Sequence, residues 1–405
     1  MLLSERQNDI LKIISQLDIS PTMYKNAEQK YKHLALFLQK NHAMDVDIYP
    51  QGSFALGTVV RPVIKGEDAG YDLDFVCQVK YNKNELSAKQ LREILEEALS
   101  SSELYGGKLK VCPECLTIEY ADLSGIGFSI DIVPAADETD EHKNSLRAKS
   151  QIPALLDTAI AIPQYGENEY FWVTNNPRGY REWFESINKP FADNSAPVYR
   201  EILFKNNRGL FATVEDIPHG LNRSALQRVI QILKYHRDIF YSQYPDGEKI
   251  KPISAIINTV VTKIAATADP KYSVFELLEY VLNEFAVYSS RQVLPSEMFF
   301  SKYGSKNAIK KNQDLWIIEN PANPEDNLAD HWNENSDIPK IFFKWTNAAK
   351  KDLIEALHKS PQEFGASLAS AFGSDIVAKT LGNKYRHLNA KPLDTVHPTK
   401  PWRQK

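Results

Sequence analysis

Cysteine is scarce in this chain of 405 residues, which contains only three. A disulfide framework needs more cysteines than that, and so small a number is typical of proteins in a reducing compartment. Long apolar runs are missing too, because no segment approaches the ~20 apolar residues of a membrane span. The N-terminus MLLSERQNDILKII brings in Glu5, Arg6 and Asp9 before an apolar stretch of signal-peptide length develops. We therefore expect a cytoplasmic protein with no membrane partner.

A surplus of positive charge is also lacking. The chain has 48 Lys and Arg against 52 Asp and Glu, which gives a formal net charge of −4. No overall basic field is available to hold a long nucleic acid, so any basic site must be local. Long nucleic acid is therefore not an expected partner.

Several well-known catalytic and metal motifs are absent. The sequence has no Gly-x-Ser-x-Gly elbow, no Gly-x-x-x-x-Gly-Lys-Ser/Thr loop and no His-Glu-x-x-His motif, which disfavours serine hydrolases, P-loop enzymes and zinc proteases. Cys112 and Cys115 form a Cys-x-x-Cys pair, but a structural zinc site needs four ligands and Cys77 is the only other thiol. We expect no zinc, and we expect these cysteines to pack in a sheet.

The length of the chain favours two domains, because one domain tends to hold roughly 100 to 200 residues. From about Asp47 to Pro134, the short alternating runs DIYPQGSF, DLDFVCQV and FSIDIVPA indicate strands, and SAKQLREILEEALSS between them indicates a helix. Long helical patterns open the chain and return after Asn222. We therefore expect an α+β domain and a second lobe that is mostly helical.

Three segments follow from these patterns. We expect a mixed sheet braced by N-terminal helices over residues 1–190, a helical lobe over residues 191–388 and a tail over residues 389–405. The tail contains several Pro residues and few apolar ones, so we expect it to be extended or mobile. The aromatic residues of FWVTNNPRGYREWF, 171–184, we interpret as packing between lobes rather than as a base-stacking surface.

Two carboxylates stand in the otherwise apolar run YDLDFVCQV. Successive side chains of a strand alternate between faces, so Asp72 and Asp74 project from one face while Leu73 and Phe75 point to the core. Asp131 stands alone among apolar neighbours in FSIDIVPA, and an adjacent strand would bring it to the same point. Carboxylates this close repel unless a cation lies between them, and Mg²⁺ prefers such oxygen ligands. Three carboxylates around two metal ions suit nucleotidyl transfer. The alternative is a sheet face with ordinary surface aspartates.

A Gly-Ser pair precedes the acidic strand at Gln51-Gly52-Ser53. Such a turn can offer backbone N–H groups and a hydroxyl to phosphate oxygens. Together with Asp-x-Asp and a third strand Asp, it resembles the DNA polymerase β-like nucleotidyltransferase superfamily. Within that superfamily QGSFALGT, an inserted polar loop, YDLDFVCQV and GFSIDIVPA look like the CD-NTases, which are bacterial relatives of cyclic GMP–AMP synthase. Later segments agree, since LQRVIQILKYHRD and IIENPANPEDNLADHW resemble parts of that family's helical lobe.

The resemblance implies a polymerase β-like nucleotidyltransferase core and a cyclic oligonucleotide synthase. The substrates would be nucleoside triphosphates, and the product a cyclic di- or trinucleotide that serves as an alarm signal in antiphage defence. A separate effector would read this signal, and some relatives have their C-terminus conjugated by a ubiquitin-like enzyme. The implied cofactor is a pair of Mg²⁺ ions, with Mn²⁺ as a substitute. The implied site residues are Asp72, Asp74 and Asp131 on the metals, Asp131 nearest the attacking hydroxyl, and Gln51, Gly52, Ser53 and Lys234 at the triphosphate.

The helical pattern around Lys234 supports its part in this site. An apolar stripe at Leu226, Val229, Ile230 and Leu233 leaves Lys234 on another face, together with Gln227 and Gln231. The alternative is a solvated face with a free lysine.

Ser254 is a further candidate for the nucleotide site. It follows the turn at Lys251-Pro252, where its hydroxyl could cap a helix or touch phosphate. Capping is the favoured interpretation, because serine is a preferred N-cap residue.

Three alternatives to cyclic oligonucleotide synthesis remain open at this point. A nucleotidyltransferase of RNA ends and one that modifies a protein or small molecule would use the same active-site chemistry. The weak net charge argues against long RNA. A nucleotide-binding module without catalysis is a different class, but loss of catalysis usually shows as a lost carboxylate, and all three are present here.

Overall fold

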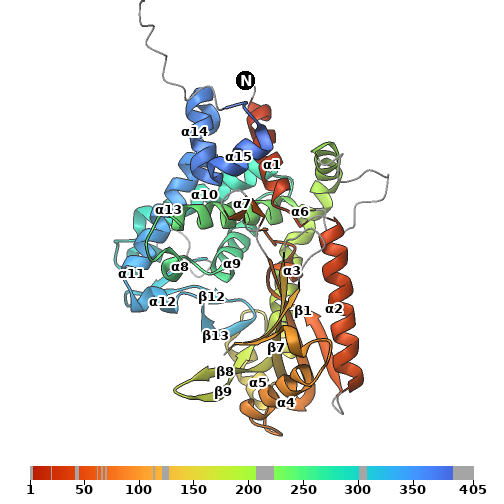
Figure 1. Ribbon diagram of the computed structural model, residues 1–405. Coiled ribbons are helices and arrows are strands. Elements are labelled where there is room, and N and C mark those ends of the chain that lie inside the picture. The colour runs from red at the N-terminus through yellow and green to blue at the C-terminus, as the bar shows by residue number, and fades with distance from the viewer. Residues whose placement is uncertain are drawn as a thin grey trace, which may run out of the picture.

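The computed structural model describes residues 3–19, 21–41, 45–61, 63–64, 67–68, 71–112, 115–120, 127–206, 223–300 and 308–385. The tail expected over residues 389–405, with the conjugation expected there, lies outside them, and so does half of the inserted loop, residues 61–70. Figure 1 shows a sheet lobe below a lobe of helices. The α+β expectation is confirmed, with a mixed sheet in one lobe and mostly helices in the other.

The main sheet has seven strands. Five of them follow the order β1-β4-β7-β6-β5, while β8 pairs with β7 and β9 pairs with β8. The central pair β4 and β7 is parallel, whereas β1 and β6 run antiparallel to it. The strands are β1 (Val46–Pro50), β4 (Tyr71–Asn82), β5 (Leu109–Val111), β6 (Leu116–Tyr120), β7 (Phe128–Asp137), β8 (Ile160–Gly166) and β9 (Glu169–Asn175).

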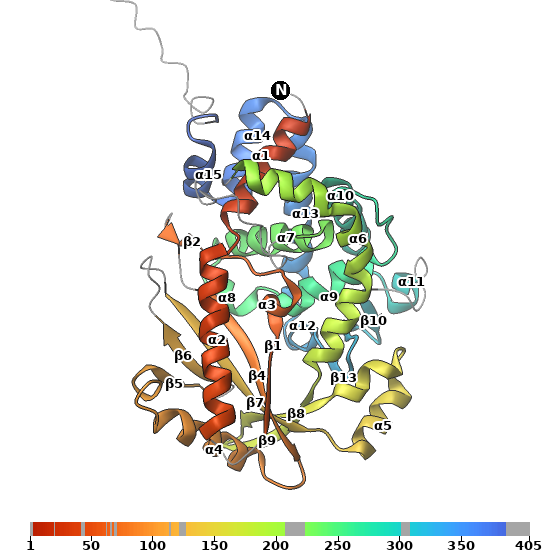
Figure 2. The same ribbon diagram turned by 90° about the vertical axis from the view of Figure 1, so that its right-hand side faces the viewer.

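Two helices cover one face of this sheet, α2 (Pro21–Asn41) and α4 (Ala88–Ser100), as Figure 2 shows. The strand alternation explains why, since Leu73, Phe75 and Cys77 of β4 are buried in the same apolar cluster as residues of both helices. Helix α4 begins at a capping box between Ser87 and Gln90. On the opposite face, Val76 and Ala135 are buried in a small apolar cluster, and polar side chains stand nearer the start of β4 and β7.

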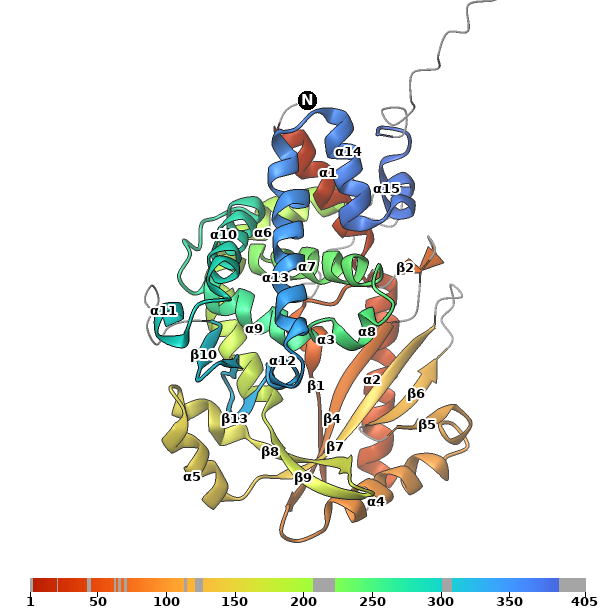
Figure 3. The ribbon, with the colours of Figure 1, turned by 90° about the vertical axis from the view of Figure 1, so that its left-hand side faces the viewer.

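The helical lobe is built around α7 (Ala225–Tyr241), whose side chains are buried over almost its whole length. Figure 3 shows α7 crossing behind the long helix α13. Trp183 and Phe184 belong to the same apolar cluster, as expected for packing side chains. The lobe contains α6 (Pro177–Asn206), α8 (Gly247–Ile250), α9 (Ser254–Ala265), α10 (Val274–Arg291), α11 (Ser296–Phe300), α12 (Asp330–Glu334), α13 (Asp337–Leu353), α14 (Pro361–Phe372) and α15 (Ser374–Leu381).

The first helix, α1 (Leu3–Gln16), packs against the end of the chain. The Arg6 guanidinium donates to the carbonyl oxygens of Leu357 and Lys359 at 2.7 and 2.6 Å. Asp9 accepts from the Tyr385 hydroxyl at 2.7 Å. The apolar residues of α1 also lie in the core of the helical lobe. We therefore propose that α1 belongs with the helical lobe, whereas the sequence pattern had grouped it with the sheet.

A short hairpin of the helical lobe reaches back to the sheet lobe. The Asn323 amide donates to the Thr174 carbonyl at 3.0 Å, and the Asn176 amide donates to the Ala322 carbonyl at 3.0 Å. Glu325 forms an ion pair with Lys149 of α5 (Asp140–Lys149). The Asn-Pro segment thus joins the two lobes. It forms β12 (Glu319–Asn320) and β13 (Asn323–Asn327), beside the hairpin of β10 (Lys310–Asn312) and β11 (Leu315–Ile317).

None of the described helices is long and apolar enough to cross a membrane.

Candidate active site

Three aspartates lie on the exposed face of the central parallel strand pair. In the register of β4 and β7, Asp74 is the partner of Asp131, and Asp72 is the partner of Ser129. Paired residues of adjacent strands point to the same face, so all three carboxylates share one face. Leu73, directly between two of them, is fully buried on the other face. The structure therefore brings together the aspartates that the sequence pattern singled out.

Two hydroxyl groups hold these carboxylates. Thr117 is the partner of Asp131 across the β6–β7 pair, and its hydroxyl donates to Asp131 Oδ1 at 2.7 Å. The Ser129 hydroxyl donates to Asp72 Oδ1. Sequence reasoning missed both hydroxyls. Ser129 stands two residues before Asp131, so strand alternation alone could have placed it on the same face.

The carboxylates carry negative charge that little on the protein offsets. Burial, followed by the charges of Asp131 and Asp72, raises the pKa of Asp74 to about 6, and Lys234 only partly opposes this. Burial also raises the pKa of Asp131, against the hydrogen bond from Thr117. Oxygen ligands with unbalanced negative charge suit a hard divalent cation.

No three His, Cys, Asp or Glu side chains in the described ranges already lie close enough together to hold a metal ion. The carboxylates would therefore converge on an ion by rotation of their side chains. In their charge and in the kind of oxygen donor they offer, these residues fit Mg²⁺.

An Asp74→Asn variant is expected to be more stable than the wild-type protein at neutral pH without metal. Because the pKa of Asp74 is raised to about 6, the folded protein binds this proton more tightly than the unfolded chain. Wild-type stability therefore falls as the pH rises from about 4 to about 6. In urea unfolding with EDTA, we expect a gain on the order of 1–2 kcal/mol at about pH 7 and none near pH 3.5.

The exposed Glu279→Gln substitution in the middle of α10 is the control, and it should leave stability unchanged at either pH. Equal stability of Asp74→Asn and wild type at neutral pH would contradict the electrostatic cost assigned to Asp74.

The Gly-Ser turn lies directly against the carboxylates. The strand expected through Phe54 ends at Pro50 instead, and α3 (Gly52–Leu56) begins at Gly52, which has φ +60°. A Cβ at Gly52 would lie 2.5 Å from Asp74 Oδ2, so only glycine fits this approach. The Gln51 N–H donates to the Asp74 carbonyl at 2.8 Å and ties the turn to β4.

Helix α7 holds this turn from the other lobe. Figures 1 and 3 show α3 between α7 and the end of β1. Lys234 Nζ donates to the Ser53 hydroxyl at 2.7 Å and to the Thr58 carbonyl at 3.1 Å. On the same face, the Gln227 amide donates to the Leu56 carbonyl at 2.8 Å, and the Gln231 amide donates to the Val59 carbonyl at 2.7 Å. Lys234 is only 5% exposed. The alternative of a solvated helix face with a free lysine is therefore wrong.

The Lys234 side chain can gain or lose its proton near neutral pH. Burial, followed by the nearby charge of Arg237, lowers its pKa to about 7, and Asp238 and Asp74 only partly oppose this. An anion beside the ammonium group would favour the charged form and raise the pKa again. Lys234 is therefore suited to bind a polyphosphate that approaches Ser53.

Ser254 does not cap its helix. Ile253 occupies the N-cap position of α9, no side chain caps that end, and Ser254 is the first helical residue. The favoured interpretation of Ser254 as a cap is thus wrong by one position. Its hydroxyl accepts from Arg237 NH1 at 3.3 Å. Arg237 lies three residues after Lys234 on α7, so Ser254 contacts a residue one turn further along the same helix.

The cysteines divide into two groups. Cys77 is buried in β4, as expected. Cys112 and Cys115 instead stand at the hairpin turn between β5 and β6, where the Cys112 N–H donates to the Cys115 carbonyl at 3.1 Å. The Arg92 guanidinium donates to both of their carbonyl oxygens. Both thiols are half-buried at the ends of these strands, 3.9 and 3.5 Å from the Thr117 hydroxyl of β6.

Comparison with known proteins agrees with this geometry. Residues 46–133 match the family model described as the nucleotidyltransferase domain of cyclic GMP-AMP synthase DncV-like proteins. These residues include the Gly-Ser turn and the three aspartates. A c-di-GMP synthase of Roseivirga ehrenbergii is 21% identical over 394 residues, which make up 96% of this chain and 89% of the relative.

Solved structures share the fold over nearly the whole chain. The CD-NTase CdnG of Bradyrhizobium diazoefficiens, in complex with GTP, superposes with a TM-score of 0.67 at 19% identity, covering 93% of this chain and 98% of the other. E. coli MS115-1 CdnC with ATP gives a TM-score of 0.57 at 15% identity and covers 91% and 98%. GTP-bound Vibrio cholerae DncV gives 0.51 at 14% identity and covers 92% and 88%. The chain is therefore a nucleotidyltransferase that carries a DncV-like domain at residues 46–133 and has the fold of the CD-NTases.

Proposed function

We propose that this nucleotidyltransferase joins nucleoside triphosphates into a cyclic di- or trinucleotide. The observation that carries the proposal is the direct contact between two halves of one site. The Gly52 turn lies against Asp74 of the sheet lobe, while Lys234 of the helical lobe donates to Ser53 of the same turn. A triphosphate bound there would place its phosphates beside the carboxylates. The similarity to a c-di-GMP synthase over almost the whole chain supports a cyclic product.

The residues divide the work between binding and chemistry. In each step a ribose hydroxyl attacks an α-phosphate in line, a phosphodiester bond forms, and pyrophosphate leaves with the bond to the α-phosphate broken. Ser53 and Lys234 would hold the leaving pyrophosphate, and the Gly52 backbone leaves room for it. By the resemblance to the CD-NTases, Asp131 would accept the proton of the attacking hydroxyl.

Asp72, Asp74 and Asp131 would hold two Mg²⁺ ions. When bound, these ions would supply charge stabilisation for the attacking and leaving oxygens. Mn²⁺ would serve as a substitute.

The biological role that we propose is an alarm signal in bacterial antiphage defence. The cyclic product would leave the enzyme and activate a separate effector protein in the cytoplasm. Conjugation of residues 389–405 by a ubiquitin-like enzyme would regulate this output. These roles rest on the similarity to CD-NTases.

The purified protein should convert nucleoside triphosphates into a phosphatase-resistant product. The test incubates it with labelled ATP, GTP, CTP and UTP and with Mg²⁺ or Mn²⁺, and then identifies the product by mass spectrometry. We expect a cyclic species whose formation stops with EDTA and returns with Mg²⁺ in excess. Because a linear chain keeps a terminal phosphate that phosphatase removes, resistance separates cyclic from linear products.

Three outcomes would contradict cyclic synthesis. Linear extension of added RNA would identify an RNA-end transferase, and labelling of another protein or small molecule would identify a modifying enzyme. Nucleotide binding without turnover under all metal and nucleotide conditions, and with a lysate added as a source of activator, would identify a binding module.

A further inference from the structure

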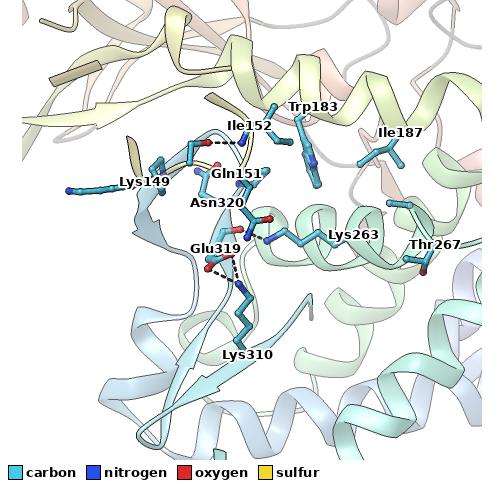
Figure 4. Close-up of a pocket in the computed structure, with 14 residues that line it drawn as sticks. Lys149, Gln151, Ile152, Trp183, Ile187, Lys263, Thr267, Lys310, Glu319 and Asn320 are labelled. Atoms are coloured by element: carbon cyan, nitrogen blue, oxygen red, sulfur yellow. Dashed lines mark hydrogen bonds and ion pairs between the residues drawn. The ribbon is translucent and has the colours of Figure 1, made fainter. Parts of the chain in front are cut away.

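A second cavity opens at the seam between the lobes. It has a volume of about 430 Å³ and is lined by residues 149–152 of the sheet lobe and by α6, α9, β10 and β12 of the helical lobe. Figure 4 shows Trp183 and Ile187 of α6 facing Lys263 of α9, with Lys310 and Glu319 at the opposite end. A volume of this size matches a small organic ligand.

One cation in this cavity has no carboxylate partner. Lys310 Nζ donates to both carboxylate oxygens of Glu319, at 2.7 and 2.8 Å, so these two charges cancel. Lys263 Nζ donates to the backbone carbonyl of Glu319 at 2.7 Å. In the described part of the chain, no carboxylate lies within ion-pair distance of Lys263. Burial lowers the pKa of Lys263 to about 8, and the charge of Glu319 only partly opposes this.

The remaining walls mix apolar residues with uncharged polar ones, which are Ser150, Gln151, Thr267 and Asn320. Trp183 offers the edge of a large aromatic ring, and Pro321 and Pro324 close another side. Ile152 also lines the cavity, although 42% of its surface is exposed. The cavity thus combines one unbalanced positive charge with a surface suited to a planar apolar group.

This cavity is separate from the carboxylate site. Helix α9 carries Ser254 at its first residue, next to Arg237, and Lys263 nine residues later. With a rise of 1.5 Å per residue, the two ends of that segment lie about 13 Å apart. None of the site aspartates, nor Ser53 or Lys234, lines the cavity.

We propose that this cavity binds a small organic anion with a planar, apolar body. The anionic group would pair with Lys263, and the planar body would lie between Trp183 and Pro321. Because its walls come from both lobes, an occupant would stabilise their relative position and so act on the nucleotide site from a distance. The inference is independent of the product that the enzyme makes.

Anilinonaphthalene sulfonate is a suitable probe, since it joins a sulfonate to fused aromatic rings. With the full chain at neutral pH, we expect saturable binding by fluorescence, with energy transfer from tryptophan. The Lys263→Met variant should bind the probe about tenfold or more weakly, because a charge-assisted hydrogen bond is worth about 1.5–3 kcal/mol. Lys271→Met, in the exposed loop after α9, is the matched control and should bind as wild type does.

A second variant tests whether weaker probe binding in Lys263→Met could come from a folding defect. Ala266 lines the cavity and is exposed at the end of α9, so Ala266→Phe should fill the space without disturbing the core. We expect it to weaken probe binding as well, while the thermal unfolding midpoint stays unchanged. N-phenylnaphthylamine, which lacks the sulfonate, should bind wild type and Lys263→Met equally weakly.

Two results would overturn the proposal. One is undiminished probe binding in both Lys263→Met and Ala266→Phe. The other is displacement of the probe by GTP or ATP in a manner that Lys234→Met abolishes, because this would place the probe at the nucleotide site.

Discussion

An Asp131→Asn enzyme should lose on the order of a thousandfold in the rate of phosphodiester formation, the scale expected for removing a group that acts directly on the reacting atoms. The amide cannot accept the proton of the attacking hydroxyl, and it binds a divalent cation far more weakly than a carboxylate does. Its shape is preserved, so the hydrogen bond from the Thr117 hydroxyl at 2.7 Å can persist on the amide oxygen. Initial rates with saturating nucleotide and Mg²⁺ measure the effect.

The control for Asp131→Asn is Asp45→Asn, which removes an exposed carboxylate beside β1 and should leave the rate unchanged. Thr117→Val is the informative intermediate. Because the hydrogen bond from Thr117 lowers the pKa of Asp131, its loss should move the acidic limb of the rate profile to higher pH, and Thr117→Ser should restore it. If Asp131→Asn retained a tenth of the wild-type rate, the role assigned to this carboxylate would be wrong.

A Lys234→Met enzyme should bind nucleoside triphosphates about tenfold to a hundredfold more weakly, since hydrogen bonds to charged groups contribute about 1.5–3 kcal/mol. Calorimetry with a non-hydrolysable triphosphate measures this affinity. In wild type, the same experiment in buffers of different ionisation enthalpy should show proton uptake near pH 8. The pKa of Lys234, about 7 in the free protein, rises when phosphate binds beside it.

The pH dependence of the folding stability gives a second test of Lys234. Since the pKa of Lys234 is lowered to about 7, the unfolded chain binds more of this proton than the folded one between about pH 7 and about pH 10. Wild-type stability should therefore rise with pH over that window, and Lys234→Met should lack this contribution. Lys249→Met, an exposed substitution in α8, is the control. Unchanged affinity in Lys234→Met would remove the lysine from the triphosphate site.

Local periodicity predicted the parts of the site that depend on one element. The alternation of β4 placed Asp72 and Asp74 opposite Leu73, because a strand fixes which face each side chain takes. The apolar stripe of α7 likewise placed Lys234 on the same face as Gln227 and Gln231, although this face is buried against the Gly-Ser turn rather than solvated. Both patterns are written in a few consecutive residues, so no knowledge of distant contacts was needed.

Other features depend on contacts between distant segments. The pairing of Asp74 with Asp131 fixes the register of two strands 57 residues apart, and no short pattern states that register. The bonds from Gln227 and Gln231 to backbone carbonyls likewise require the two lobes to meet. The predicted cap position at Ser254 was one residue away from the observed N-cap, Ile253. Local sequence determines the exact end of a helix least well.

The packing of α1 also constrains how the lobes can move. The chain begins in the helical lobe, enters the sheet lobe between α1 and α2, and returns along α6. At the first crossing, Asp18 accepts from Arg228 at 2.7 Å and from Gln231 at 2.9 Å, both on α7. Two covalent links allow rotation about the line that joins them, but sliding or separation of the lobes would stretch one link. We therefore expect the lobes to rotate about the line between these two links, and α7, which holds the Gly-Ser turn, lies beside the first of them.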